Sequence, residues 1–251
     1  MISLKGDFGE INGVETILFD KDGTFVDLHY FWGKMTELRV TEVVKRFELD
    51  DSCFDELCNC LGYDANSGKM RSNGITALYS RSKIIEIFRK DLVEFGVITT
   101  NEILAEIFDY VSSAFYKDMK KYIKPIPTAI TFIKSLKSRG VKTGIVTSDS
   151  IESTALTLDF FDWNDLFDVF VGRESSNETK ESGALTKIAL ESLNADPKTT
   201  VMIGDAPMDY ISAKNASIDA TILVATGQID VEELKQTSKF VLNDLSSLEI
   251  I

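Results

Sequence analysis

The amino-acid sequence predicts an α/β protein whose parallel sheet is interrupted by a helical insertion. Short, continuous apolar runs alternate with helical patterns over much of the chain, as in proteins built from β-α-β units. Three of these runs end directly in Asp, Thr or Gly-Asp. Between residues 27 and 124 the strand pattern is replaced by apolar residues spaced three and four positions apart, which is the spacing of amphipathic helices.

Five apolar runs have the length and composition of buried strands. They cover residues 16–19, 141–146, 167–171, 200–203 and 220–225. Uninterrupted apolar strands are typical of parallel sheets that helices cover on both faces. In such open sheets, ligands bind at the carboxyl ends of the strands, so the polar residues that end three of these runs are expected to converge on one crevice.

The insertion is predicted to be helical and to form a separate domain. Helical spacing covers residues 35–47, 82–95 and 101–116. The stiff segment at its exit contains Pro125 and Pro127 and leads into a further helix over 128–139, which stops at Gly140. We therefore predict a core domain formed by residues 1–27 and 123–251, and a helical domain formed by residues 28–122.

The composition and net charge of the chain limit which classes of molecule are expected to bind it. With 44% hydrophobic and 27% charged residues, the chain has the composition of a folded protein. Its formal net charge of -13 repels polyanions, so nucleic acid is not expected as a partner. No apolar run approaches the ~20 residues that span a bilayer, and the first residues lack the apolar stretch of a signal peptide. We expect a cytoplasmic protein without a membrane partner.

Cysteine and histidine offer little for metal binding or catalysis. Cys53, Cys58 and Cys60 are odd in number and match neither a disulfide framework nor a zinc site, so free thiols are expected. The single histidine, His29, cannot form a histidine-rich metal site and is expected to pack near the start of the insertion.

Two aspartates follow the first predicted strand, in the segment Asp20-Lys21-Asp22-Gly23-Thr24. Alternate residues of an extended chain point the same way, so Asp20 and Asp22 are expected to face one site and Lys21 the opposite face. One carboxylate can attack phosphorus while its neighbour exchanges protons with the leaving oxygen and with water. The same pattern is also typical of a strand that simply ends in a turn.

Hydroxyl groups follow the second run, at Thr147 and Ser148. The side chain of Thr147 can donate to a phosphoryl oxygen, and N–H groups at the start of the next helix can add to this contact. Both residues are also common helix caps, so capping remains an alternative.

The fourth run ends in Gly204-Asp205, with Asp209 four residues further on. Asp205 supplies a hard oxygen ligand for a divalent cation, and Asp209 can hold the water shell of the metal or a neighbouring cation. A capped helix start is the structural alternative. Pro207 fits the first turn of that helix.

Together these segments resemble the haloacid dehalogenase-like superfamily, whose phosphatases carry D-x-D-G-T, a strand-terminal Thr or Ser, a Lys and G-D-x-x-x-D in this order. The resemblance covers the predicted core domain. It implies a Rossmann-like parallel sheet with an inserted α-helical cap domain, as in subfamily I, which includes phosphoglycolate phosphatases and β-phosphoglucomutases. It also implies a Mg²⁺-dependent phosphatase that acts on a small phosphorylated metabolite.

The resemblance assigns roles to the acidic residues. It implies that Asp20 is the nucleophile and a Mg²⁺ ligand, and that Asp22 is the acid and base, with its main-chain carbonyl on the metal. Asp205 is implied to complete the protein ligands, and Asp209 to lie just outside them. Family dehalogenases lack the second aspartate, so the presence of Asp22 disfavours dehalogenation.

The resemblance also identifies the groups that bind the transferring phosphoryl group. Thr147, Ser148 and Lys180 are implied in this role. Lys187 competes with Lys180 for the lysine of the family pattern, but Lys187 falls within the following predicted helix and is expected to face solvent.

Specificity is expected to come from the insertion, and the substrate itself is left open. Aromatic and basic residues, namely those at 28–34 together with Arg39, Arg71, Arg81 and Lys83, suit a sugar phosphate or a phosphorylated hydroxy acid. Phe31 and Trp32 are more typical of helix packing than of ligand contact. Residues 64–74 read as a loop that could overhang the site. The alternatives are a phosphomutase of the same superfamily and a non-catalytic phospholigand-binding or regulatory protein, and the oligomeric state is unknown.

Overall fold

The computed structural model describes residues 1–251, which divide into two compact units. The core unit consists of residues 1–27 and 125–251, and the helical unit consists of residues 28–124. The sequence placed the end of the insertion at residue 122, whereas the helical unit runs on to residue 124.

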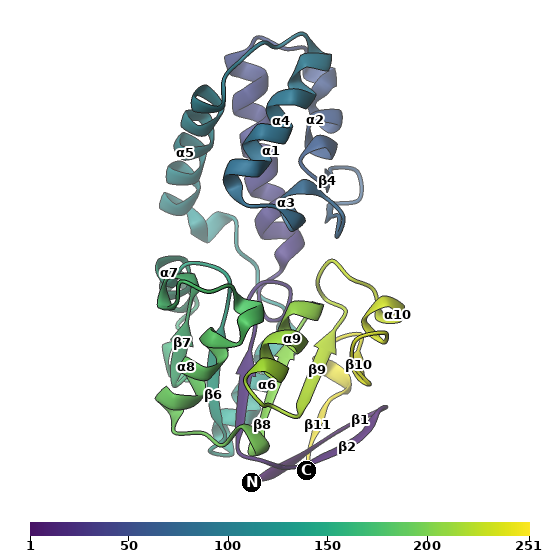
Figure 1. The fold of residues 1–251 in the computed structure, drawn as a ribbon, viewed down its shortest axis with the longest axis vertical. Helices are drawn as coiled ribbons and strands as arrows, with labels where there is room; N and C mark the ends of the chain where they lie inside the picture. Colours follow the sequence, from purple (N-terminus) through teal and green to yellow (C-terminus); the bar gives the residue numbers. More distant parts are fainter. The chain divides into compact units, whose positions relative to one another are not determined.

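The core unit contains a six-stranded parallel sheet in the order β10-β9-β8-β3-β6-β7 (Figure 1). The strands are β3 (Thr16–Phe19), β6 (Lys142–Val146), β7 (Val169–Val171), β8 (Thr200–Gly204), β9 (Ala220–Val224) and β10 (Phe240–Leu242). Every residue of β3 and β8 is buried, as their continuous apolar sequences predict. The short edge strand β10 was not predicted.

Strand order places a topological switch point beside β3. The chain proceeds from β3 to β6 and β7 on one side, and then returns to β8, β9 and β10 on the other. In open α/β sheets the crevice for ligands lies at such a point, outside the carboxyl ends of the strands. The residues that follow β3, β6 and β8 are therefore the ones brought together.

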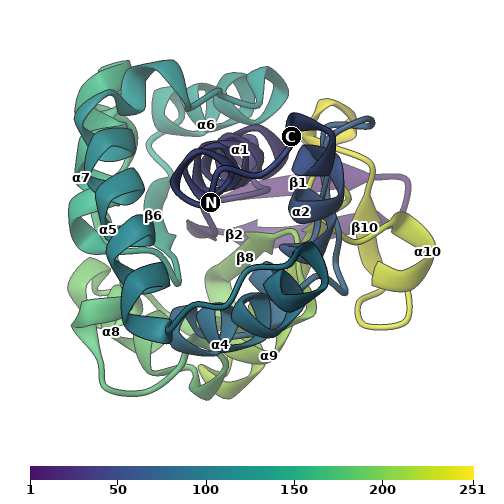
Figure 2. The same ribbon diagram turned by 90° about the horizontal axis from the view of Figure 1, so that it is seen from above.

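Helices cover both faces of this sheet (Figures 1 and 2). The helices are α6 (Pro127–Ser138) and α7 (Ile151–Phe161) on one face, α8 (Ala184–Leu193) and α9 (Pro207–Asn215) on the other, and the short α10 (Val231–Leu234). Leu18, Val146 and Met202 from the sheet pack with Leu185 and Ala213 in a buried cluster. Helices α8 and α9 therefore bury apolar side chains against the sheet.

The two ends of the chain meet in a second, smaller sheet that was not predicted. Strands β1 (Ile2–Gly6), β2 (Gly9–Val14) and β11 (Glu249–Ile250) are antiparallel in the order β11-β1-β2. The N–H group of Ser3 donates to the carbonyl of Ile251 at 2.9 Å, and the reverse bond has the same length.

The helical unit contains five helices and one small hairpin. They are α1 (Leu28–Arg46), α2 (Phe54–Cys60), α3 (Ile75–Leu78), α4 (Arg81–Asp91), α5 (Asn101–Lys117), β4 (Tyr63–Asp64) and β5 (Lys69–Met70). Figure 2 shows α1 between α2 and α5. Phe88, Leu104 and Phe108 are fully buried in the apolar cluster of this unit.

The hairpin corrects the expectation that residues 64–74 form a loop without strands. Tyr63 pairs with Met70, and Asp64 Oδ1 accepts hydrogen bonds from the N–H groups of Asn66 and Ser67, at 3.0 and 3.3 Å. His29 Nδ1 accepts a hydrogen bond from the N–H of Met70 at 3.1 Å. The histidine therefore links the start of α1 to the hairpin.

The four basic residues that were expected to set specificity all have partners within the helical unit. Arg39 is buried over the Phe108 ring, Arg71 donates to Asn59, Arg81 pairs with Asp109, and Lys83 pairs with Glu86. Phe31 packs against Phe115 with ring centroids 5.0 Å apart. Their role in specificity stays a prediction.

The remaining sequence expectations concern thiols and membrane spans. Cys53, Cys58 and Cys60 are free, and burial raises the pKa of Cys58 to about 12. Cys58 is therefore an inert thiol. None of the helices combines the length and the apolar character needed to cross a bilayer.

Candidate active site

Polar residues from three adjacent strands meet at the carboxyl edge of the sheet. Asp20 follows β3, Thr147 follows β6, and Asp205 follows β8, where β6 and β8 are the two neighbours of β3. The N–H of Asp20 donates to the carbonyl of Ile203 at 2.8 Å and continues the β3–β8 pairing up to the site. Each of the three side chains is thus carried by the rigid end of a buried strand.

Three of the predicted acids form one buried cluster. Carboxylate oxygens of Asp20, Asp205 and Asp209 lie within 4.8 Å of one another, and the residues are 7%, 6% and 1% exposed. Burial raises the pKa of Asp20 to about 6. Burial, together with the charge of Asp20, holds the pKa of Asp205 well above its usual range. The surroundings of the cluster therefore disfavour the charged form of these two carboxyl groups.

Lys180 supplies a cation to this cluster. Its ammonium contacts Asp20 Oδ1 and lies 2.6 Å from Asp209 Oδ1, and the residue is 3% exposed. Burial disfavours the charged amine, but the carboxylates of Asp20 and Asp209 outweigh it and raise the pKa of Lys180 above its ordinary value. Lys180 is therefore protonated at neutral pH. Lys187, the competing residue, is exposed on α8.

The turn before α8 explains how Lys180 reaches the cluster. Lys180–Ser182 form a short 3₁₀ helix that ends at Gly183, whose φ is +81°. A Cβ at Gly183 would lie 2.9 Å from the carbonyl carbon of Asn215, at the end of α9. Glycine therefore permits both the left-handed backbone and the close approach to α9, the helix that carries Asp209.

Asp209 uses both carboxylate oxygens within the site. Oδ2 accepts a hydrogen bond from the N–H of Ala206 at 3.1 Å, and Oδ1 faces Lys180. A Cβ on Gly204 would overlap this carboxylate, which explains the glycine at that position. Asp209 thus orients Lys180 and caps α9. Its predicted place just outside the metal ligands stays a prediction.

The donor set fits a hard divalent cation such as Mg²⁺. Carboxylate oxygens are the ligands that this ion prefers, and the Lys180 ammonium pairs with two of the three acids in the cluster, Asp20 and Asp209. Gly23 and Gly227 approach the Asp205 carboxylate so closely that a Cβ at either position would overlap it. The lack of a side chain at these two glycines therefore leaves space for the Asp205 carboxylate and for a cation bound to it.

Asp22 and Lys21 lie differently from the predicted alternation. Lys21 is completely buried, and its ammonium is 2.8 Å from Asp22 Oδ1 and 3.0 Å from Asp149 Oδ2. The expectation that Lys21 points away from the site is wrong, because the chain leaves the extended conformation here. The carbonyl of Lys21 accepts hydrogen bonds from the N–H groups of Phe25 and Val26, both at 3.1 Å.

The pKa of Asp22 is raised to about 6. Burial is the main cause, and the charge of Asp149 adds to it, while the Lys21 ammonium opposes both. A carboxyl group with this pKa exchanges its proton near neutral pH, which suits an acid and base.

The buried acids predict how the stability of the metal-free protein depends on pH. The pKa values of Asp20 and Asp22, both about 6, exceed the ordinary value of 3.8, so the folded state binds more protons than the unfolded state between these values. The free energy of unfolding should therefore fall as pH rises from about 4 to above 6, by about 1.4 kcal/mol per group for each pH unit between the two pKa values.

Urea unfolding at several pH values, with and without Mg²⁺, tests this expectation. Added Mg²⁺ should raise stability most at the higher pH, where the carboxylates are ionised. Stability that increases steadily from pH 4 to pH 7 in chelator would contradict raised pKa values at the site.

Thr147 and Ser148, the two predicted phosphate-binding hydroxyl residues, differ in burial and in hydrogen bonding. Thr147 is 2% exposed, and its Oγ1 accepts a hydrogen bond from the N–H of Asp149 at 3.1 Å, which leaves its O–H proton to donate. Ser148 is exposed, and its hydroxyl lies 3.8 Å from the sulfur of Met208. The phosphate-binding role of both residues stays a prediction.

Sequence reasoning gave no role to Asp149, although it lies directly after Thr147-Ser148. Its Oδ1 accepts the N–H of Ser150 at 2.7 Å, and its Oδ2 pairs with Lys21. Two features of the sequence could have indicated this pair. Asp149 directly follows the hydroxyl residues, and Lys21 stands between Asp20 and Asp22.

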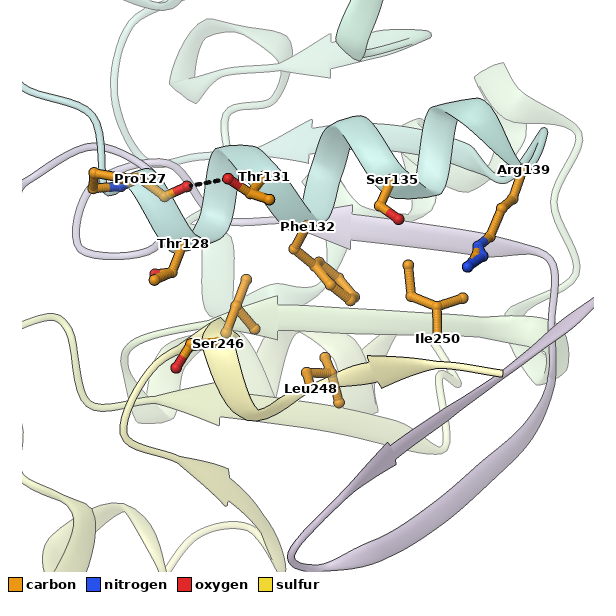
Figure 3. A pocket seen from close by; sticks show the side chains of 10 residues that line it. Pro127, Thr128, Thr131, Phe132, Ser135, Arg139, Ser246, Leu248 and Ile250 are labelled. Atoms are coloured by element: carbon orange, nitrogen blue, oxygen red, sulfur yellow. Dashed lines mark hydrogen bonds between the residues drawn. The ribbon is translucent and has the colours of Figure 1, made fainter.

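A separate cavity of about 470 Å³ lies in the core unit between α6 and the C-terminal segment. Figure 3 shows Phe132 of α6 pointing toward Leu248 and Ile250, with Arg139 at the end of the helix. None of the predicted site residues lines this cavity. It is therefore distinct from the acidic cluster.

Known proteins match this chain over most of its length. A family model described as haloacid dehalogenase-like hydrolase matches residues 17–223. A phosphoglycolate phosphatase from Aquifex aeolicus (strain VF5) is 26% identical over 242 residues, which cover 94% of this chain and 95% of that protein. Pyrophosphatase PpaX from Halalkalibacterium halodurans is 23% identical over 210 residues, which cover 84% of this chain and 83% of that protein.

Solved structures share the fold. A hydrolase of the same superfamily, subfamily IA, variant 1, from Geobacter sulfurreducens PCA aligns with a TM-score of 0.65 at 14% identity, covering 93% of this chain and 94% of that chain. The predicted α/β fold is therefore confirmed.

Proposed function

The chain belongs to the haloacid dehalogenase-like hydrolase family, and on this premise we propose that it is a Mg²⁺-dependent phosphatase that cleaves a small phosphomonoester through a phosphoaspartate on Asp20. The observation that carries the proposal is the contact of Lys180 with Asp20 inside a cluster of three buried carboxylates. Such a site combines a nucleophile with cations that offset its charge.

The acidic residues are assigned to metal binding as follows. The carboxylates of Asp20 and Asp205 and the main-chain carbonyl of Asp22 would hold Mg²⁺. When bound, Mg²⁺ supplies positive charge that offsets the repulsion between the anionic substrate and the attacking carboxylate. Asp209 holds Lys180 in place, as its ion pair at 2.6 Å supports.

In the first step, the carboxylate of Asp20 attacks phosphorus in line with the leaving oxygen. The bond between phosphorus and that oxygen breaks while the carboxyl group of Asp22 donates its proton to it. The ammonium of Lys180 and the hydroxyl of Thr147 donate hydrogen bonds to the phosphoryl oxygens, and this electrostatic stabilisation accounts for much of the rate in phosphoryl transfer.

In the second step, water replaces Asp20 on phosphorus. The carboxylate of Asp22 accepts a proton from the water as its oxygen bonds to phosphorus, and the bond between phosphorus and Asp20 breaks. Inorganic phosphate leaves and both aspartates return to their starting state. The raised pKa of Asp22, about 6, supports a group that gives and takes a proton in turn.

The substrate class is tested by phosphate release from a panel of compounds with Mg²⁺ and with chelator. The named relatives recommend phosphoglycolate and pyrophosphate, and hexose phosphates and nucleotides complete the panel. We expect release from one chemical class, which chelator abolishes. Isomerisation of a sugar phosphate without release would indicate a mutase, and undiminished release in chelator would contradict the metal assignment.

A further inference from the structure

Lys21 joins the loop after β3 to the loop after β6 inside the protein. Its ammonium lies 2.8 Å from Asp22 Oδ1 and 3.0 Å from Asp149 Oδ2, and its side chain is 0% exposed. We propose that Lys21, anchored by Asp149, is a positioning residue that fixes the Asp22 carboxyl group for proton transfer to the leaving oxygen. This inference rests on the proposed function, because it assumes that Asp22 is the acid and base.

The geometry explains why only one oxygen of Asp22 is held. Lys21 engages Oδ1, which leaves Oδ2 for proton exchange. Burying an ammonium group costs free energy unless the group is paired with an acid. The Lys21 ammonium therefore stays between the carboxylates of Asp22 and Asp149. Asp22 is thereby held in one orientation relative to the end of β3.

Asp149 connects this arrangement to the phosphate-binding loop. Its Oδ1 accepts the N–H of Ser150, its Oδ2 pairs with Lys21, and its own N–H donates to Thr147 Oγ1. One residue therefore anchors Lys21 through its side chain and orients Thr147 through its backbone. Substituting the side chain alone separates the two roles, because the backbone N–H is retained.

This role predicts a dependence on the leaving group. An alkyl phosphate releases a strongly basic alkoxide, which must receive a proton as the bond breaks, so its hydrolysis depends on a well-placed Asp22. p-Nitrophenyl phosphate releases a weakly basic phenolate that needs little protonation. Misplacing Asp22 should therefore slow the first substrate much more than the second.

The test compares kcat/KM, which covers the steps up to departure of the leaving group, for an alkyl phosphate that the protein hydrolyses, such as phosphoglycolate, and for p-nitrophenyl phosphate. Both values are measured with Mg²⁺ in Lys21→Met, Asp149→Asn and the unsubstituted protein. We expect the ratio of kcat/KM for the alkyl phosphate to kcat/KM for p-nitrophenyl phosphate to fall by on the order of 10²-fold in Lys21→Met and by about tenfold in Asp149→Asn. The inhibition constant of inorganic phosphate should change by less than about twofold, because Thr147 and Lys180 are untouched. Lys187→Met, an exposed lysine on α8, is the matched control.

Each outcome decides the inference. An equal loss of kcat/KM on both substrates, or weaker inhibition by phosphate with an unchanged ratio, would show a purely structural ion pair and overturn the positioning role. Asp149→Asn keeps the Lys21–Asp22 pair and provides the answer if Lys21→Met does not fold. If the unsubstituted protein releases phosphate from no compound of the panel while inorganic phosphate still binds, the proposed function fails and the positioning role falls with it.

Discussion

Asp20→Asn should reduce phosphate release to background, a loss on the order of 10⁴-fold or more. The amide cannot attack phosphorus, and no other carboxylate occupies its position at the end of β3. The substitution also removes a negative charge from a cluster whose carboxylate oxygens lie within 4.8 Å of one another, so the folded state should be at least as stable as the unsubstituted protein.

Measuring kcat checks the expected loss of activity, and unfolding in urea checks the expected stability. Asp244→Asn is a suitable control, because Asp244 caps a 3₁₀ turn in the C-terminal segment and is not one of the site residues. Activity of Asp20→Asn within a factor of about ten of the unsubstituted protein would exclude Asp20 as the nucleophile.

Lys180→Met should damage both activity and stability. The ammonium contacts Asp20 and Asp209 in a buried site, so its removal leaves carboxylates without a partner and costs about 3–5 kcal/mol of unfolding free energy. Loss of a preorganised donor to the phosphoryl group should lower kcat by about 10²–10³-fold. Lys180→Arg should not restore activity, because the planar guanidinium does not fit the space of a compact ammonium.

Lys187→Met is the matched control for this variant, since the exposed side chain should contribute within about 0.5 kcal/mol. The stability loss of Lys180→Met should shrink as pH falls, because protonation of Asp20, whose pKa burial raises, removes a charge that Lys180 offsets. A variant as stable and as active as the control would contradict the ion pairs seen at Lys180.

The sheet could be read from the sequence where strands are buried on both faces. β3, β8 and β9 are mostly apolar runs, β6 ends in the apolar residues Ile145 and Val146, and the polar residues at the ends of β3, β6 and β8 indicated the crevice. β10 was missed because its apolar run is limited to Phe240–Leu242 between Lys239 and Asn243, whereas the edge strand β7 lies in a longer predicted run at residues 167–171. β1 and β2 pair with each other as neighbours in the sequence, whereas β11 joins their sheet through pairing between the two chain ends, which no local pattern records.

The candidate site likewise contains residues that could be predicted from local motifs and one residue pair that could not. Asp20, Asp205 and Lys180 could be proposed because each belongs to a motif read along the chain. The pairing of Lys21 with Asp149 joins residues far apart in sequence, and it depends on a turn that breaks the alternation of the strand. Period-two reasoning placed Lys21 on the wrong side because the strand ends at Phe19.

The measurement that tests the central claim most directly is the detection of a phosphoryl group on Asp20 during turnover. The protein is mixed with its best substrate and Mg²⁺, quenched in acid after milliseconds, digested, and analysed by mass spectrometry. We predict the added mass of one phosphoryl group on the peptide that contains Asp20, and its absence in Asp20→Asn. Rapid phosphate release with an unmodified Asp20 peptide, or with the phosphoryl group on another residue, would contradict the account.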